Sequence, residues 1–202
     1  MGELEMKKIT MMMSAAGLVF AAMNAAHAAD GTINFTGEIV AASCSIAGGN
    51  GTSVTGGKGE QSIDVKMGKV SVDALDNTAG GGIAAGTAIN LNLDCGATGK
   101  GLNTVKVRFD PASGSGVDGT NNKLLKTTGT AKGVGIGIYN TAGTLLNLNA
   151  NETFDAPLVQ GGTAEAPTYT ANLGLRAGYV KAGAAVEAGT ANGTLPFTLT
   201  YE

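Results

Sequence analysis

The chain has 202 residues, a formal net charge of -3 and only 14% charged residues. This composition excludes the basic surface of a nucleic-acid-binding protein and an acidic interaction tail. Glycine is abundant, with 33 residues, but it follows no collagen-like period and falls between short alternating runs, as turn residues do. The composition therefore predicts an all-β fold.

The N-terminal region has the features of a secretory signal. Lys7 and Lys8 precede an apolar run over residues 11–23, and a small-residue sequence, AHA, follows and ends at Ala28. The pattern predicts a Sec-type signal peptide over residues 1–28, with the letters MGELE as an upstream extension. An uncleaved anchor is the alternative, but the apolar run is short for a membrane span. About 174 residues would remain, which is enough for one domain with a core.

The two cysteines, Cys44 and Cys95, both lie in the part predicted to be exported. An even count in an oxidising compartment predicts one disulfide, and two cysteines allow a single pairing. Two free thiols or a metal pair are the alternative. A metal site is disfavoured because the only histidine, His27, lies within the predicted signal peptide.

Period-two alternation of apolar and polar residues predicts the extended segments of the mature chain. In chain order they are residues 31–39, 40–46, 62–70, 87–95, 104–110, 132–140, 169–183 and 194–202, with a hairpin-like turn at 141–148. We expect a Gly-rich loop at 47–60, a turn at 77–82 and a polar loop at 111–122. Many short strands separated by turn residues predict a β-sandwich, with no helix longer than a turn or two.

Both ends of the mature chain are cleanly alternating strands. Residues 31–39 place isoleucine, phenylalanine and glycine on one face, and residues 194–202 place leucine, phenylalanine and tyrosine on one face. An apolar strand with free N–H and C=O groups is a template for pairing, which proteins normally protect. We therefore expect each end to pair with another strand.

The last block, GTANGTLPFTLTYE, contains a penultimate tyrosine (Tyr201), alternating apolar residues before it, and Gly189 fourteen positions from the end. Four further stretches precede it in order: INFTGEIVAASCSI, VKMGKV, INLNLDC and VGIGIYNTAGTLL. On these residues the chain resembles the shaft pilins of chaperone–usher fimbriae, the type 1-like family, over essentially the whole mature chain. Two features depart from the family pattern. The insert at 47–60 lengthens the cysteine spacing, and Pro196, within the last strand, cannot donate a ladder hydrogen bond.

The resemblance implies a pilin domain over residues 41–202, an immunoglobulin-like sandwich that lacks its seventh strand and carries an apolar groove beside its last strand. It implies that a periplasmic chaperone lends a strand to fill the groove. At an outer-membrane usher, the N-terminal extension of the next subunit, residues 29–40, would then replace the chaperone strand.

The same resemblance assigns the candidate site residues and partners. The donor strand would present Gly31, Ile33, Phe35, Gly37 and Ile39. The acceptor groove and C-terminal strand would comprise Gly189, Leu195, Phe197, Leu199, Tyr201 and Glu202. Basic side chains of the chaperone would hold the Glu202 carboxylate. The partners implied are identical or related pilin subunits, the chaperone and the usher, in a fimbrium on the cell surface. No nucleic acid and no cofactor are implied.

Enzymatic function is not expected, because the predicted mature chain has no histidine and no free cysteine for acid–base or nucleophilic catalysis. The stretch GTSVTGGKGE is not a phosphate loop, since Thr52 replaces the first glycine and Gly59 follows Lys58. The aspartates in DPASGSGVDG lack the spacing of an EF-hand calcium loop.

Two alternatives to a major shaft subunit remain: a free-standing secreted carbohydrate-binding β-sandwich, and a minor or adaptor fimbrial subunit. A two-domain tip adhesin would need a receptor domain before the pilin domain.

Overall fold

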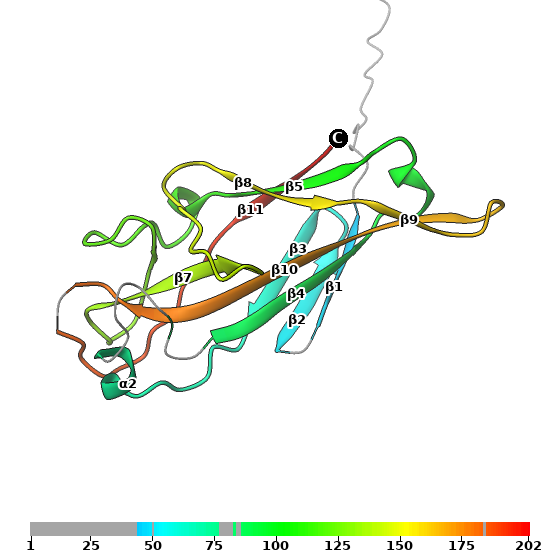
Figure 1. Ribbon diagram of the computed structural model, residues 1–202. Helices are drawn as coiled ribbons and strands as arrows, with labels where there is room; N and C mark the ends of the chain where they lie inside the picture. Colours follow the sequence, from blue (N-terminus) through cyan, green and yellow to red (C-terminus); the bar gives the residue numbers. More distant parts are fainter. Residues whose placement is uncertain (1–43, 50, 77–82, 84–85, 184) are drawn as a thin grey trace, which may run out of the picture. The chain divides into compact units, whose positions relative to one another are not determined.

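Strands are the main regular elements of the structure, a computed structural model that describes residues 44–49, 51–76, 83, 86–183 and 185–202 (Figure 1). All of these residues belong to one compact unit, Val40–Glu202. The predicted signal peptide and the predicted donor strand, residues 29–40, lie outside the described residues.

The described strands form two antiparallel sheets and a separate hairpin. The larger sheet has the order β1-β4-β10-β7-β6, with β9 also paired to β10: β1 (Ser45–Gly48), β4 (Gly86–Asp94), β10 (Pro167–Lys181), β7 (Val134–Asn140), β6 (Leu125–Lys126) and β9 (Val159–Gly162). The smaller sheet has the order β11-β5-β8: β11 (Phe197–Tyr201), β5 (Thr104–Phe109) and β8 (Thr153–Pro157). The hairpin joins β2 (Thr52–Gly57) and β3 (Glu60–Val65). Short helical turns are α2 (Val72–Asp76), η2 (Gly96–Gly99) and η3 (Pro111–Ser113).

The core forms where the alternating strands meet face to face. In β4, Leu91 and Leu93 are buried while Asn92 between them is exposed, as period-two alternation predicts. Their partners across the ladder in β10 are Leu173 and Ala171. Val107 of β5, in the other sheet, belongs to the same buried cluster. The two sheets therefore face each other around one core, which confirms the prediction of an all-β sandwich.

A second, smaller cluster covers the outer face of β7. It contains Leu124, Tyr139, Val180 and Ala182. Because of this cover, β7 is buried on both faces over Val134–Tyr139, although its sequence predicts burial of one face only.

The Gly-rich segment at 47–60 differs from its predicted loop conformation. It contains the end of β1, all of β2 and the turn into β3. Val54 of β2 lies opposite Ile63 of β3, and both side chains pack against the main core. Gly59 has φ +90°, which a turn residue without Cβ adopts freely. The loop prediction is wrong because the many glycines hide the short strand β2, which is stabilised by the packing of Val54 against the main core.

The predicted disulfide is confirmed. Cys44 and Cys95 are bonded, with their Cα atoms 4.0 Å apart. The register of β1 and β4 places Ser45 opposite Asp94, so Cys44 and Cys95 are the next opposite pair. The bond therefore joins two adjacent strands at one end of the larger sheet.

Candidate functional site

The last strand, β11, lies at the edge of the smaller sheet (Figure 1). It pairs with β5, and no other strand in the described part of the chain pairs with it. The register places Leu199 opposite Val107 and Tyr201 opposite Val105. One long edge of β11 is therefore open to a further strand.

The direction of the backbone groups follows from the ends of this ladder. Glu202 N–H donates to Thr104 O at 2.9 Å, Thr104 N–H donates to the Glu202 main-chain oxygen at 2.8 Å, and Asp110 N–H donates to Pro196 O at 2.8 Å. Antiparallel ladders alternate between bonded and non-bonded pairs. The even-numbered residues of β11 therefore bond to β5, and the N–H and C=O groups of Phe197, Leu199 and Tyr201 point to the open edge.

The side chains of the same three residues are only half-buried, whereas Val105 and Val107 of β5 are 0% and 2% exposed. The three side chains pack against the same core as these valines. Directly opposite residues on one face of an antiparallel pair lie side by side. The difference therefore shows that the apolar side chains of β11 are less completely covered by the rest of the molecule than those of β5.

Pro196 lies just outside β11 and is compatible with an open edge. Its carbonyl accepts the bond from Asp110 N–H, so its missing N–H would have faced β5. The proline removes a bond at the end of the existing ladder and none from the open edge. This resolves the departure noted in the sequence.

Glu202 is held within the chain itself. Its side-chain Oε2 lies 2.7 Å from Lys106 Nζ, and the hydrogen bond and charge of Glu202 raise the pKa of Lys106 above its ordinary value. Its main-chain oxygen also accepts a hydrogen bond from Asn103 N–H. The interaction with chaperone side chains expected for Glu202 remains a prediction.

Tyr201 connects the last strand to the disulfide. Its hydroxyl accepts a hydrogen bond of 3.2 Å from Cys44 N–H. Cys44 is 2% exposed, and it immediately precedes β1. The end of β11 is thus tied to the start of the larger sheet.

The other two predicted groove residues lie before β11. Leu195 is half-buried and packs against the main core, beside the apolar face of the strand. Gly189 instead lies against Thr130 and Ala131, where an added Cβ would be 2.5 Å from Thr130 Oγ1. The structure therefore brings together Leu195, Phe197, Leu199 and Tyr201, and it places Gly189 at a different contact.

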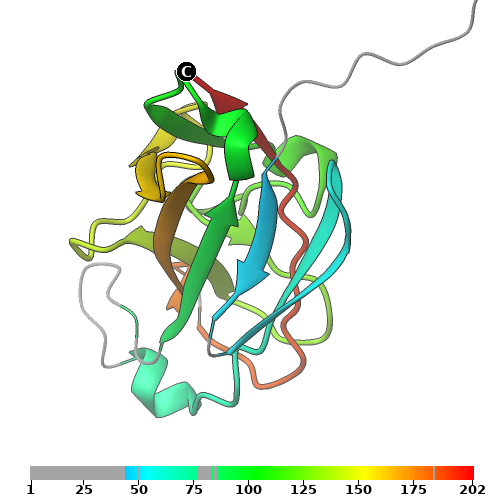
Figure 2. The ribbon, with the colours of Figure 1, turned by 90° about the vertical axis from the view of Figure 1, so that its right-hand side faces the viewer.

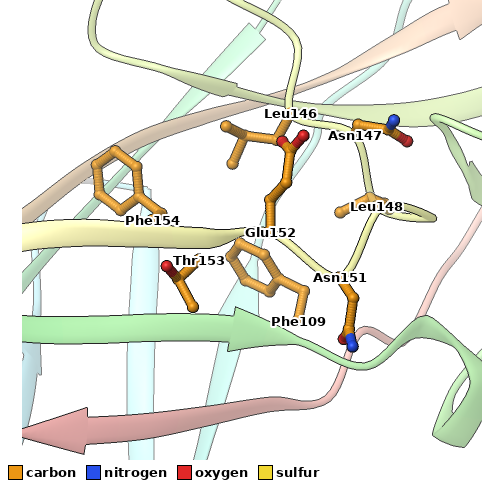
Figure 3. Close-up of a pocket in the computed structure, with 8 residues that line it drawn as sticks. All are labelled: Phe109, Leu146, Asn147, Leu148, Asn151, Glu152, Thr153 and Phe154. Atoms are coloured by element: carbon orange, nitrogen blue, oxygen red, sulfur yellow. The ribbon is translucent and has the colours of Figure 1, made fainter.

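A small pocket elsewhere in the described structure carries no comparable arrangement (Figure 3). It lies between the end of β5 and the segment that leads into β8. Its lining residues are Phe109, Leu146, Asn147, Leu148, Asn151, Glu152, Thr153 and Phe154. Glu152 is the sole acidic or basic side chain among them, so the pocket holds no acid–base pair.

In the described residues, no group of three or more histidine, cysteine or acidic side chains is placed to hold a metal ion. No helix in the described segments has the length and apolar character needed to span a bilayer.

Comparisons with known proteins agree on one family. The family model described as "Fimbrial protein" matches residues 33–202. The probable major fimbrial subunit LpfA of Escherichia coli O157:H7 is 32% identical over 203 residues, covering 99% of each chain. The long polar fimbria protein A of Salmonella typhimurium (strain LT2) is 33% identical over 202 residues, again covering 99% of each.

One solved structure has the same type of fold. The CupB6 tip adhesin from Pseudomonas aeruginosa superimposes with a TM-score of 0.50 at 22% identity, over 67% of this chain and 35% of the adhesin chain. The P pilus rod subunit PapA gives a TM-score of 0.49 at 25% identity, over 85% of this chain and 100% of that one.

Proposed function

This chain belongs to the fimbrial protein family, and we propose that it polymerises by donor-strand exchange. The family consists of structural proteins and not of enzymes. The mature chain is a subunit of a surface fimbrium. Each subunit accepts, along the open edge of β11, the N-terminal extension of the next subunit. Export to the periplasm, a chaperone that fills the edge first, and an outer-membrane usher complete the proposed pathway.

A single observation carries this proposal: three residues of β11 have both unpaired backbone groups and half-buried apolar side chains. Phe197, Leu199 and Tyr201 are these residues. β-Strand addition uses both features, since main-chain hydrogen bonds give affinity and side-chain contacts at alternate positions give specificity. A strand added here would satisfy the backbone and extend the cover over the core.

Residues 29–40 supply a strand with the matching pattern. Ile33, Phe35 and Ile39 share one face of this alternating sequence with Gly31, which precedes them, and Gly37, which lies between Phe35 and Ile39. Each large apolar side chain contributes about 1.5–3 kcal/mol if it is fully buried. The contact uses different surfaces on donor and acceptor, so it is head-to-tail and generates a filament without closing into a ring.

The proposal is tested by thermal unfolding of two secreted chains, one of residues 29–202 and one with residues 29–40 moved behind Glu202 through a flexible linker. We expect the rearranged chain to be a stable monomer, because its donor strand can fold back antiparallel to β11. The native order should be less stable or should polymerise. A native-order chain that is already a stable monomer, and is only weakened by the rearrangement, would favour a self-contained carbohydrate-binding sandwich instead.

A variant in the donor strand tests the same proposal in cells. Phe35→Asp should abolish filaments while subunits still accumulate in soluble form with the chaperone, because the acceptor edge is unchanged. Thr36→Asp is the matched control, since it adds the same charge to the opposite face of the same strand. Electron microscopy and subunit immunoblots measure both outcomes, and normal filaments from Phe35→Asp would contradict the proposal.

A further inference from the structure

The larger sheet also has an edge strand, β1, and its edge is in a different state from that of β11. β1 pairs with β4 on one side. Gly49 N–H donates to Asn90 O at 2.8 Å, so by alternation Ala47 and Ser45 also bond to β4. The N–H and C=O groups of Cys44, Ile46 and Gly48 therefore point to the free edge.

At Ile46, a side chain occupies this edge. Ile46 N–H donates to Gln61 Oε1 at 3.2 Å, and Gln61 Nε2 donates to Ile46 O at 3.4 Å. A carboxamide carries the same donor and acceptor as a peptide group. Gln61, which belongs to β3, therefore bonds to Ile46 as a neighbouring strand would.

The positions on either side of Ile46 also have neighbours. Cys44 N–H donates to Tyr201 Oη. At Gly48 an added Cβ would lie 2.9 Å from Thr52 Oγ1 and 3.0 Å from Thr52 O, so the start of β2 lies against one face of the strand there. Side chains of β11 and β3 thus bond to two successive outward positions of β1, Cys44 and Ile46. In Figure 2, β1 is the short blue arrow and the hairpin β2–β3 is the cyan pair.

We propose that Gln61 determines the specificity of strand addition: its carboxamide closes the free edge of β1, so an incoming strand pairs with β11 and not with β1. This inference rests on the proposed donor-strand function. Exposed sheet edges attract unwanted strands, and proteins protect them with local devices. Here the device is one amide side chain, and the protection leaves a defined acceptor edge.

The test uses the full exported chain, with its disulfide formed, and a synthetic peptide of residues 29–40 that carries a photoreactive group. Mass spectrometry after irradiation locates the cross-links. We expect the unchanged protein to be labelled at residues 197–201 and not at 45–48. Gln61→Ala should raise labelling at 45–48 by about tenfold, the order of effect expected when a hydrogen-bonded pair is lost.

Gln160→Ala is the matched control, because Gln160 is an exposed glutamine on another edge strand, β9. It should give the labelling pattern of the unchanged protein. Gln61→Glu is a second variant of nearly the same shape: it can still accept from Ile46 N–H but has no N–H for Ile46 O. It should also raise labelling at 45–48, and it serves where Gln61→Ala does not fold.

Equal labelling of residues 45–48 in the Gln61 variants and the unchanged protein would overturn the inference. Labelling of residues 45–48 in the unchanged protein would overturn it as well. Labelling at 197–201 is read separately. Its absence from the unchanged protein would count against the proposed function, while a difference at 45–48 would still support the role of Gln61.

Discussion

At the residue scale, Gly189 has a steric role that follows from its contacts. It lies where the chain before β11 runs beside residues 128–132, and its place in the acceptor groove stays a prediction. Thr190 O accepts from Ala131 N–H at 3.0 Å, and Thr190 N–H donates to Thr130 Oγ1 at 3.0 Å. Gly189 is needed there because a side chain would collide with the neighbouring backbone.

Gly189→Ala should therefore lower the free energy of unfolding by about 1–3 kcal/mol, the usual range for overpacking. The added Cβ would meet Ala131 N and Thr130 Oγ1, which cannot both move without breaking the contacts between the two segments. Urea unfolding of the secreted chain measures the change. Gly119→Ala is the control, because nothing lies within 4 Å of its added Cβ. Equal effects of the two substitutions would contradict the steric explanation.

At the element scale, strands with the same sequence pattern differ in what covers them. β4 and β11 both alternate apolar and polar residues, yet Leu93 of β4 is 0% exposed and Leu199 of β11 is half-buried. β4 has a strand on each side, whereas β11 is paired on one side within the described chain. The two strands share a pattern and differ in their number of neighbouring strands, which accounts for the difference in burial between Leu93 and Leu199.

The disulfide acts at this scale because it joins β1 to β4 over a sequence separation of 51 residues. Replacing both Cys44 and Cys95 by alanine should lower the free energy of unfolding by about 4 kcal/mol in the chain-entropy model. Urea unfolding with and without a reductant measures it. The reductant should destabilise the parent chain by a similar amount and leave the double variant unchanged. A variant as stable as the oxidised parent would show that β1 is held by its ladder and edge contacts alone.

At the scale of the whole molecule, stability should fall as the pH rises above about 10. Burial raises the pKa of Tyr139 and Tyr179 above the ordinary value of 10.0, and the contact with Glu202 raises the pKa of Lys106 above 10.5. In all three cases the folded chain holds its proton more tightly than the unfolded chain. The contribution is complete below the unfolded pKa and is lost as the pH rises through the folded pKa.

Urea midpoints measured between about pH 8 and pH 11.5 check this, since they span the ordinary pKa values of tyrosine and lysine. We expect the midpoint to decline over the upper part of this range. Tyr179→Phe should make the decline shallower, because it removes one titrating group, although it also removes the hydrogen bond to Ala191 O. A midpoint that stays constant or rises with pH would contradict the expected sign.

The amino-acid pattern alone predicts the strands that alternate over many residues, the disulfide and the family. The strands predicted at 87–95, 104–110, 132–140 and 169–183 correspond to β4, β5, β7 and β10, and the segment predicted at 194–202 contains β11. These predictions succeed because period-two alternation is a local property, and because two cysteines in an exported chain allow one pairing.

Which sheet edges are open depends on the packing of the whole chain. The strands β6, β8 and β9 are short, and β2 lies in a Gly-rich segment, so none has a pattern that stands alone. On the edge of β1, Gln61 bonds to Ile46, which lies 15 positions away in the sequence, and Tyr201 bonds to Cys44, which lies 157 positions away. A pattern of alternating residues shows that a strand has an apolar face, but the presence of a neighbour along its edge depends on how distant segments pack. For this reason, only the folded chain distinguishes the closed edge of β1 from the open edge of β11.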